Sequence, residues 1–175
     1  MAAAAVAALL AAYSAEGPAP PVRDCRTSAY GDLGQGWQRR AVVAGPVAFV
    51  GLRQGYRSVP RASPRTAARV KVLVVVEPRA VVTLSIAARS QRLASLAYAR
   101  PGLPDPPNPL SAGSTSVRFR ACAHANSGER WNRGTQFPGY FLLAGRGCVG
   151  VEVRARGRQG VLRRTLRFGV TRCAS

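Results

Sequence analysis

From residue 41 onward, hydrophobic and polar positions follow the two-residue alternation of β-strands. In the segment 80–87, Val82, Leu84 and Ile86 share one face, and Thr83 and Ser85 share the other. The segment 69–76 is instead a continuous apolar run with many β-branched residues, which is typical of a buried strand. No stretch after residue 15 has the 3.6-residue period of an amphipathic helix.

Similar β-prone stretches recur along the chain, separated by turns rich in glycine and proline. They cover 41–53, 69–76, 80–87, 92–99, 116–122, 139–144, 147–155 and 161–171. About eight short strands without helices predict a mainly β protein, an antiparallel two-sheet sandwich that is Ig-like in architecture. A closed β-barrel is the alternative fold. We expect the sandwich to occupy 41–175, preceded by a linker or arm over 16–40.

The first 15 residues form an apolar segment that carries no charged side chain. This segment is shorter than the about 20 residues that a membrane-spanning helix needs. It matches the apolar part of a secretory signal and ends in small residues that suit cleavage after Ser14. No basic residue precedes it, so either the start lies upstream or the signal is marginal; an alanine-rich helix is the alternative. We predict export to the cell envelope or the extracellular space, with no membrane span once the signal is removed.

The four cysteines, Cys25, Cys122, Cys148 and Cys173, are widely spaced and have only His124 as a further soft ligand. Zinc sites need paired ligands at short spacing, so we expect two disulfides and no metal or cofactor. Three pairings are possible. We favour Cys122–Cys148 with Cys25–Cys173, which would pin the N-terminal arm to the last strand. Strand parity places Cys122, Cys148 and Cys173 on the polar face, which predicts peripheral bridges.

The chain is strongly basic, with 26 Lys and Arg against 7 Asp and Glu and a formal net charge of +19. Lys71 is the only lysine. Strand parity collects many of the arginines on one polar sheet face, namely Arg118, Arg120, Arg154, Arg156, Arg163 and Arg167. A solvated sheet face and the codon bias of a GC-rich genome are the alternative explanations for this abundance of arginine.

Among these arginines, we predict that Arg118, Arg120, Arg154 and Arg167 bind polyanions, because strands would hold them in a fixed array. The arginines between residues 57 and 69 lie among prolines and are expected to be mobile. No zinc finger, helix-turn-helix or RNP-like motif accompanies the charge, so binding to nucleic acid would not be sequence-specific. We therefore expect an exported, non-enzymatic binding module for anionic polymers of the cell envelope, whose oligomeric state stays open.

The candidates for catalysis are few. The only histidine is His124, and the alternative function is a small secreted hydrolase that uses His124 with Asp32 or Glu129. The chain has no G-x-S-x-G motif, and its sparse carboxylates are expected to pair with arginines.

The loop 123–138 offers ligand-binding side chains in Arg130, Trp131 and Asn132. Such a mixture of aromatic and amide groups suits sugars, stacked bases or protein partners. Alternatively, Trp131 folds back and caps the core.

Several short pieces of the chain carry a resemblance to other proteins. They are 45–53 (GPVAFVGLR), 119–122 (FRAC), 139–141 (GYF), 147–149 (GCV) and 167–169 (RFG) with Cys173. In these pieces the chain resembles uncharacterised exported proteins of high-GC actinobacteria, over roughly 25–173. The resemblance implies a secreted or envelope β domain and brings no catalytic residue with it.

Overall fold

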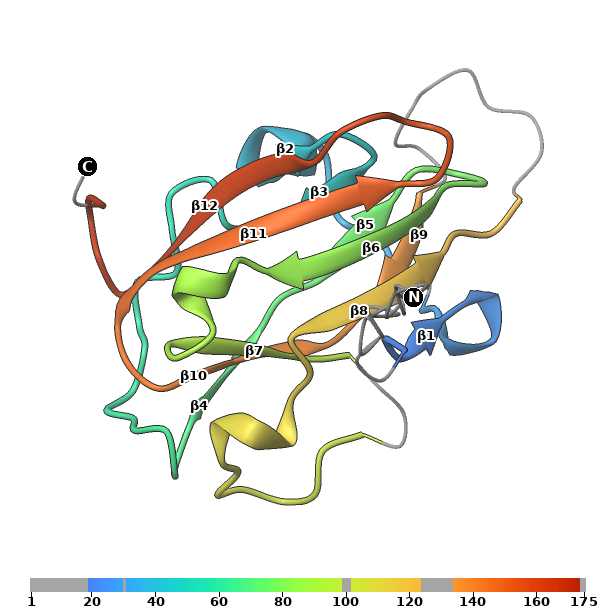
Figure 1. Cartoon of the computed structure of the whole chain (residues 1–175). Coiled ribbons are helices and arrows are strands. Elements are labelled where there is room, and N and C mark those ends of the chain that lie inside the picture. The colour runs from blue at the N-terminus through green and yellow to red at the C-terminus, as the bar shows by residue number, and fades with distance from the viewer. Residues whose placement is uncertain (1–18, 30, 99–101, 124–133, 174–175) are drawn as a thin grey trace, which may run out of the picture.

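The computed structural model describes residues 19–29, 31–98, 102–123 and 134–173 (Figure 1). Within these ranges the chain forms strands and short 3₁₀ helices, and no α-helix. The strands are β1 (Val22–Arg23), β2 (Val42–Ala44), β3 (Val47–Phe49), β4 (Ala68–Lys71), β5 (Val74–Val76), β6 (Val81–Ile86), β7 (Ala94–Ala97), β8 (Ser116–Arg120), β9 (Thr135–Phe137), β10 (Tyr140–Leu143), β11 (Gly147–Ala155) and β12 (Leu162–Phe168). The 3₁₀ helices are η1 (Cys25–Thr27), η2 (Trp37–Arg40), η3 (Ala88–Ser90) and η4 (Leu110–Ala112). The prediction of a mainly β protein is confirmed.

The largest sheet has five strands in the order β1-β8-β6-β11-β12 (Figure 1). The short β1 runs parallel to β8, and the other neighbours are antiparallel. Inward-facing side chains alternate along β8 and β6, so Val117, Phe119, Val82, Leu84 and Ile86 are buried. Their neighbours in sequence face outward, as the alternation predicts.

The remaining strands form two sheets, in the orders β4-β10-β7 and β2-β3-β5-β9. One bent ribbon joins them, because β4 and β5 pair in the same register with β10 and β9. Between the two pairs, Val72 N donates a hydrogen bond to Gly139 O over 3.0 Å. Pro138 has no N–H to continue the ladder, and the ribbon changes sheets there.

This bend is one reason why the described residues hold twelve strands rather than about eight. The run 69–76, expected as one buried strand, is divided between β4 and β5 in different sheets. The expected strand over 41–53 is the hairpin β2–β3, divided by the turn at Gly45, whose φ is +58°. The strands β1 and β9 lie outside the stretches predicted from alternation.

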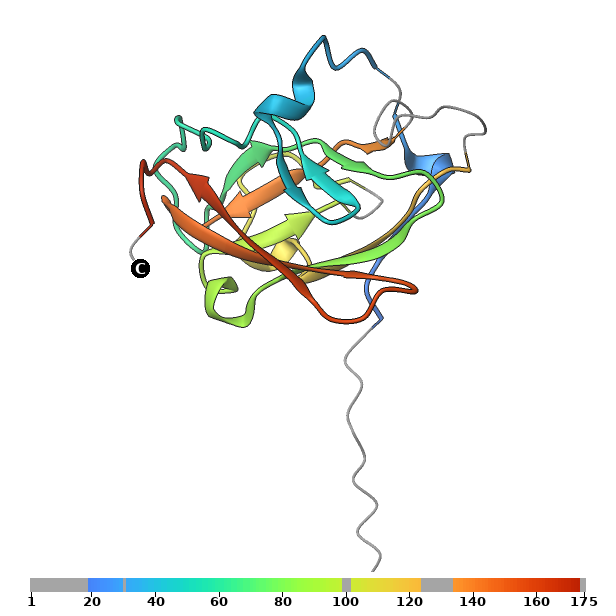
Figure 2. The ribbon, with the colours of Figure 1, turned by 90° about the horizontal axis from the view of Figure 1, so that it is seen from above.

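The sheets pack in a sandwich-like arrangement around one core, and the described strands do not close into a barrel. Buried aromatic rings run through this core from sheet to sheet. Tyr98 meets Phe119 at 5.5 Å and Phe141 at 6.3 Å between ring centroids, and Phe141 meets Phe168 at 5.3 Å. In Figure 2, the hairpin β2–β3 lies on the side of the molecule opposite β6.

The outer faces of the two layers differ. On the β2-β3-β5 side, Trp37 of η2 is only 7% exposed and packs in a small second cluster with Ala41, Ala48 and Val75. On the five-stranded sheet, the outward-facing Arg118 of β8 is exposed. One layer is therefore covered by its own chain, while the other presents polar side chains to solvent.

The N-terminal arm is fastened to the domain by a buried arginine. Arg23 is 4% exposed, and its guanidinium donates to Tyr98 O and to Thr27 Oγ1. It also lies 5.9 Å from the centroid of the Phe137 ring. Residues 22–27 therefore belong to the packed structure, although 16–40 was expected as a linker or arm.

The chain contains two disulfides, as predicted, but the favoured pairing is wrong. The bridges are Cys25–Cys122 and Cys148–Cys173, with Cα–Cα distances of 5.4 and 5.8 Å. The first forms because β1 lies beside β8 and brings Cys25 to the end of that strand. The second forms because Cys148 pairs with Arg167 of β12, six residues before Cys173.

Strand parity also misplaces Cys122. It is 5% exposed rather than on the polar face, because β8 ends at Arg120 and the alternation stops there. Its N–H donates to Thr135 Oγ1 over 2.7 Å. The bridge from Cys148 to Cys173 is peripheral, as expected, since Cys173 is exposed.

Tyr98 packs against the bend of the ribbon. Its side chain is fully buried, and its hydroxyl donates to Val72 O over 2.6 Å. Burial raises the pKa of the Tyr98 phenol above its usual range, so the group stays neutral and keeps donating. A Cβ at Gly139 would lie only 2.3 Å from Cδ1 of the Tyr98 ring, so glycine permits this close approach.

We predict that Gly139→Ala lowers the free energy of unfolding by about 1–3 kcal/mol, because the added methyl group displaces the ring. Urea denaturation followed by fluorescence measures this change. Gly145→Ala is the matched control, since a Cβ there meets nothing within 4 Å. Equal midpoints for the two variants would contradict the packing described at the bend.

Candidate functional site

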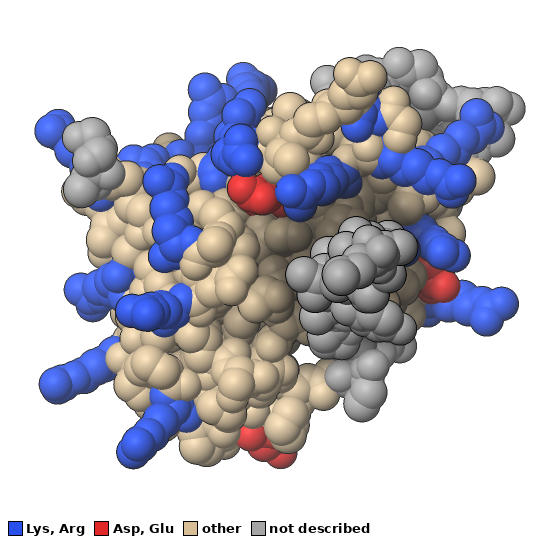
Figure 3. Space-filling model, in the orientation of Figure 1, with Lys and Arg blue, Asp and Glu red and all other residues tan. Residues whose placement is uncertain are grey.

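A hollow of about 840 Å³ lies on the outer face of the five-stranded sheet, which we call the sheet hollow. It is lined by Val81, Thr83, Arg118, Arg120, Arg154, Ala155, Arg156, Arg158, Gly160 and Val161. The residues come from β6, β8, β11 and the turn after β11. Figure 3 views the molecule in the orientation of Figure 1 and shows that basic side chains far outnumber acidic ones there.

The sheet register arranges four of these arginines in two rows. Thr83 of β6 pairs with Arg118 on one side and with Arg154 on the other. Val81 pairs with Arg120, and its carbonyl accepts the backbone N–H of Arg156 over 2.9 Å. In each row, an arginine of β8 and an arginine of β11 or of the residue after it stand on either side of a smaller β6 side chain.

The dimensions of this arrangement follow from sheet geometry. The two arginines of a row stand on strands separated by β6, so their Cα atoms are about 10 Å apart. The two rows are two residues apart along the strands, which is about 7 Å. The short side chains of Val81 and Thr83 form the floor, and the arginines form two walls. The result is a trough that runs along β6 with positive charge on both sides.

Little negative charge balances the trough. Arg118, Arg120 and Arg156 make no side-chain hydrogen bond or ion pair with any residue that the structure describes. The remaining two arginines have distant partners: Arg154 lies 4.0 Å from Glu152, and Arg158 lies 4.0 Å from Glu77. Guanidinium groups stay protonated at any physiological pH, so the trough keeps its charge.

Glu152 marks the border of the sheet hollow. Its carboxylate accepts a 3.0 Å hydrogen bond from Nε of Arg163 on β12, which is closer than its contact with Arg154. All three side chains are partly or largely open to solvent, and exposed ion pairs of this kind contribute little to stability. Their effect here is electrostatic: Glu152 neutralises the sheet face beside the trough, not within it.

The structure brings together three of the four arginines predicted to bind polyanions. Arg118, Arg120 and Arg154 line the sheet hollow, whereas Arg167 pairs with Cys148 at the other end of β11. Six residues separate Cys148 from Arg154, which is about 20 Å along the strand. Parity assigns a residue to a face of the sheet but does not give its position along the strand.

Arg158 is a member of the sheet hollow that strand parity could not identify. It follows β11 in a turn, where its N–H donates to Ala155 O over 3.1 Å. Gly157 and Gly160 have φ values of +78° and +82°, and these left-handed residues turn the chain back toward β12. The sequence did contain a signal for Arg158, namely the dense arginines of 154–158 (RARGR). A residue in the turn that follows a strand lies close to the last residues of that strand, so Arg158 could be expected near Arg154 and Arg156.

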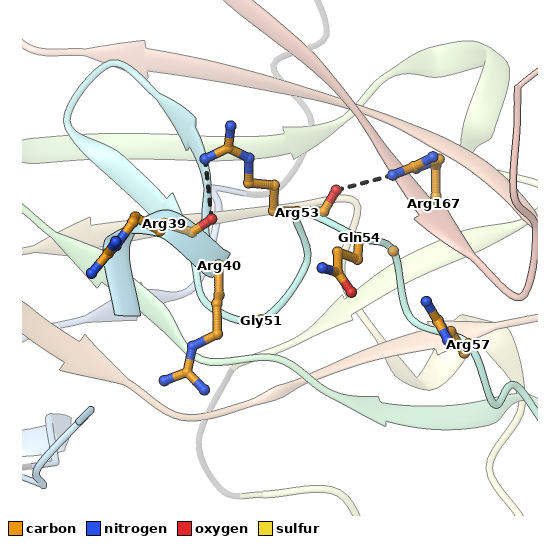
Figure 4. Close-up of a pocket in the computed structure, with 8 residues that line it drawn as sticks. Arg39, Arg40, Gly51, Arg53, Gln54, Arg57 and Arg167 are labelled. Carbon is orange, nitrogen blue, oxygen red and sulfur yellow. Dashed lines mark hydrogen bonds between the residues drawn. The ribbon is translucent and has the colours of Figure 1, made fainter. Parts of the chain in front are cut away.

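A second hollow of about 840 Å³, the loop hollow, lies near Arg167. It is lined by Arg39, Arg40, Gly51, Arg53, Gln54, Gly55, Arg57 and Arg167. These residues come from η2, from the loop 51–57 and from β12, so no local pattern in the sequence could reveal the site. Figure 4 shows Arg39 and Arg40 on one side of Gln54 and Arg57 on the other.

Most residues proposed for the alternative hydrolase and for the ligand loop lie outside the described residues, namely His124, Glu129, Arg130, Trp131 and Asn132. Asp32 is described and exposed. Its carboxylate accepts the N–H of Gly34 over 2.7 Å, which stabilises the glycine-rich turn. Within the described ranges, no three His, Cys, Asp or Glu side chains gather in a way that could hold a metal ion.

Comparison with known proteins returns no match to a family model, a curated protein or a solved structure. The resemblance to exported actinobacterial proteins therefore stays a prediction. Among the described residues, no helix has both the length and the apolar character needed to cross a membrane.

Proposed function

We propose that the protein is an exported, non-enzymatic module that binds linear, phosphate-bearing polymers of the cell envelope. The observation that carries this proposal is the trough in the sheet hollow, with Arg118 and Arg120 along one side and Arg154 and Arg156 along the other. A linear polyanion lying along β6 would pass between these two walls. Strand pairing holds the walls in place, so their backbone does not have to be ordered on binding.

Arginine is well suited to such a ligand. Its planar guanidinium can donate two parallel hydrogen bonds to one phosphate group, and it stays charged at all relevant pH values. Binding would release counterions condensed on the polymer, so affinity would fall steeply with salt. Because the chain has no zinc finger, helix-turn-helix or RNP-like motif to present side chains to base edges, we expect no preference for a nucleotide sequence.

The covalent structure supports a compartment outside the cytoplasm. All four cysteines are paired, and disulfides of this kind persist in oxidising environments. There, envelope polymers rather than chromosomal DNA present phosphate groups to the trough. The Ig-like architecture expected for the sandwich is part of this proposal, and it fits a binding module because antibody variable domains of this architecture bind ligands.

For binding, we predict that the triple variant Arg118→Gln, Arg120→Gln, Arg154→Gln elutes from a phosphate-polymer column at clearly lower salt than the wild type. With each phosphate contact that is lost, about one counterion fewer is released on binding. The affinity near 0.1 M salt should therefore fall on the order of 100-fold. Glu152→Gln should shift elution to higher salt, because it removes the carboxylate beside the trough.

The matched control for this experiment is the triple variant Arg61→Gln, Arg65→Gln, Arg92→Gln. These three arginines are exposed and line neither hollow, so the control removes the same charge from other places. Elution of both triple variants at the same salt would overturn the proposed site. A duplex DNA column run in parallel separates the envelope polymer from nucleic acid, since preferential retention on DNA would favour the latter.

For export, we predict that the protein recovered from outside its host cell begins at Ala15 and contains no free thiol. Cleavage after Ser14 would leave Val22 free to pair with β8 and Cys25 free to pair with Cys122. N-terminal sequencing and thiol titration under denaturing conditions measure both properties. A cytoplasmic protein that begins at Met1 and has four free thiols would contradict the proposal.

A further inference from the structure

The loop hollow is a second concentration of positive charge, separate from the trough. Five of its eight lining residues are arginines, and no carboxylate lines it. Arg39, Arg40, Arg53 and Arg57 are all exposed. None of its arginines forms an ion pair with a residue that the structure describes. Electrostatically, the loop hollow is therefore as open to an anion as the sheet hollow.

Neutral backbone groups hold three of these arginines in position, and one of them is Arg40, whose guanidinium donates to Leu33 O over 3.3 Å. The Arg53 guanidinium donates to Arg39 O over 3.1 Å, and Arg167 donates to Arg53 O over 3.0 Å and to Thr171 O over 2.6 Å (Figure 4). Carbonyl oxygens orient a guanidinium without cancelling its charge. The remaining N–H groups of Arg53 and Arg167 can still donate to an incoming anion, since each guanidinium carries five donors.

Backbone contacts also fix the loop to the sheet. Tyr56 N donates to Arg167 O over 2.8 Å, and Arg53 N donates to Arg40 O over 3.0 Å. Gly55 has a φ of +79°, and a Cβ there would lie 3.0 Å from Cβ of Arg167. The loop, η2 and β12 therefore present their arginines together. The spread of Arg39, Arg40 and Arg57 suits successive groups of an extended polymer better than one small anion (Figure 4).

The two hollows lie apart. Arg167 is about 20 Å from Arg154 by strand geometry, and Figure 1 shows β12 running from the turn after β11 toward the C-terminus. Between them lies Glu152, whose carboxylate pairs with Arg163 over 3.0 Å and lies 4.0 Å from Arg154. The distance between the hollows and this carboxylate favour two polymer segments over one continuous track.

We propose that the loop hollow is a second binding site for phosphate-bearing polymers, and that one molecule bridges two polymer chains. The bridging role rests on the function proposed for the sheet hollow, whereas binding at the loop hollow does not. Two sites on one rigid domain raise the effective concentration of the second site once the first is occupied. A protein with this property cross-links an anionic polymer layer without catalysing a reaction.

The test uses long-chain inorganic polyphosphate as the probe and light scattering as the measure of bridging. A loop-hollow variant carries Arg39→Gln, Arg40→Gln and Arg57→Gln, which spare the hydrogen bonds made by the Arg53 and Arg167 side chains. A sheet-hollow variant carries Arg118→Gln, Arg120→Gln and Arg154→Gln. The Arg61, Arg65 and Arg92 triple variant serves as the charge control, and urea denaturation confirms that all variants fold.

We expect the wild type and the charge control to raise scattering several-fold at substoichiometric protein, and added salt to reverse the rise. Each single-hollow variant should still bind polyphosphate but should no longer bridge it. Bridging by the loop-hollow variant at the wild-type level would overturn the second site, and so would loss of bridging by the charge control. If the sheet-hollow variant alone binds and bridges like the wild type, the function proposed for the trough fails while the loop hollow remains a site.

Discussion

The alternation of side chains across β8, β6 and β11 determines both the core and the candidate site. Phe119 and Val117 point inward into the aromatic core, so Arg118 and Arg120 between and after them must point outward. The register with β6 then decides which groups meet, because Thr83 stands between Arg118 and Arg154. A one-residue slip of β8 would bury the arginines and expose Phe119, so the packing that stabilises the domain also maintains the trough.

The domain maintains this array despite considerable charge repulsion. A net charge of +19 disfavours the compact state, and few carboxylates are present to offset it. Two features that do not depend on charge balance act in the opposite direction. One is the aromatic core around Phe141, which joins the sheets. The other is the pair of disulfides, which close loops of 97 and 25 residues and restrict the unfolded chain.

The N-terminal arm is also held to the domain by contacts that need no carboxylate. Arg23 carries a positive charge into the edge of the core, where carbonyl and hydroxyl oxygens accept its hydrogen bonds and the Phe137 ring faces it. Such a buried charge is costly unless its donors are satisfied. The N-terminal arm is therefore part of the folded domain, and its strand β1 is the edge strand of the five-stranded sheet.

Periodicity was sufficient to identify the β class and the outward direction of Arg118, Arg120 and Arg154, and the number and spacing of the cysteines were sufficient to predict two disulfides. These features depend on local alternation and on cysteine count. The pairing of the cysteines could not be predicted in the same way, because it depends on β1 lying parallel to β8, far away in sequence. The division of 69–76 between two sheets likewise depends on Pro138 and Gly139 in the partner strand.

The loop hollow was even harder to predict from the sequence, because it depends wholly on contacts between distant segments. Arg39, Arg53 and Arg167 come from three separate segments. Long-range hydrogen bonds bring them together, such as Tyr56 N to Arg167 O and the Arg167 guanidinium to Arg53 O. Within the sheet hollow, in contrast, neighbouring strands supply residues whose parity was visible. A candidate site on a regular sheet face is therefore easier to anticipate from sequence than one built by loops.

The central claim is that binding depends on an ordered array of arginines and not on net charge. The most direct measurement is the slope of the logarithm of polyphosphate affinity against the logarithm of salt concentration. If Arg118, Arg120 and Arg154 each contact a phosphate, replacing all three by glutamine should reduce the magnitude of this slope by about 2. Replacing Arg61, Arg65 and Arg92 should leave the slope nearly unchanged. Equal changes for the two triple variants would contradict the account.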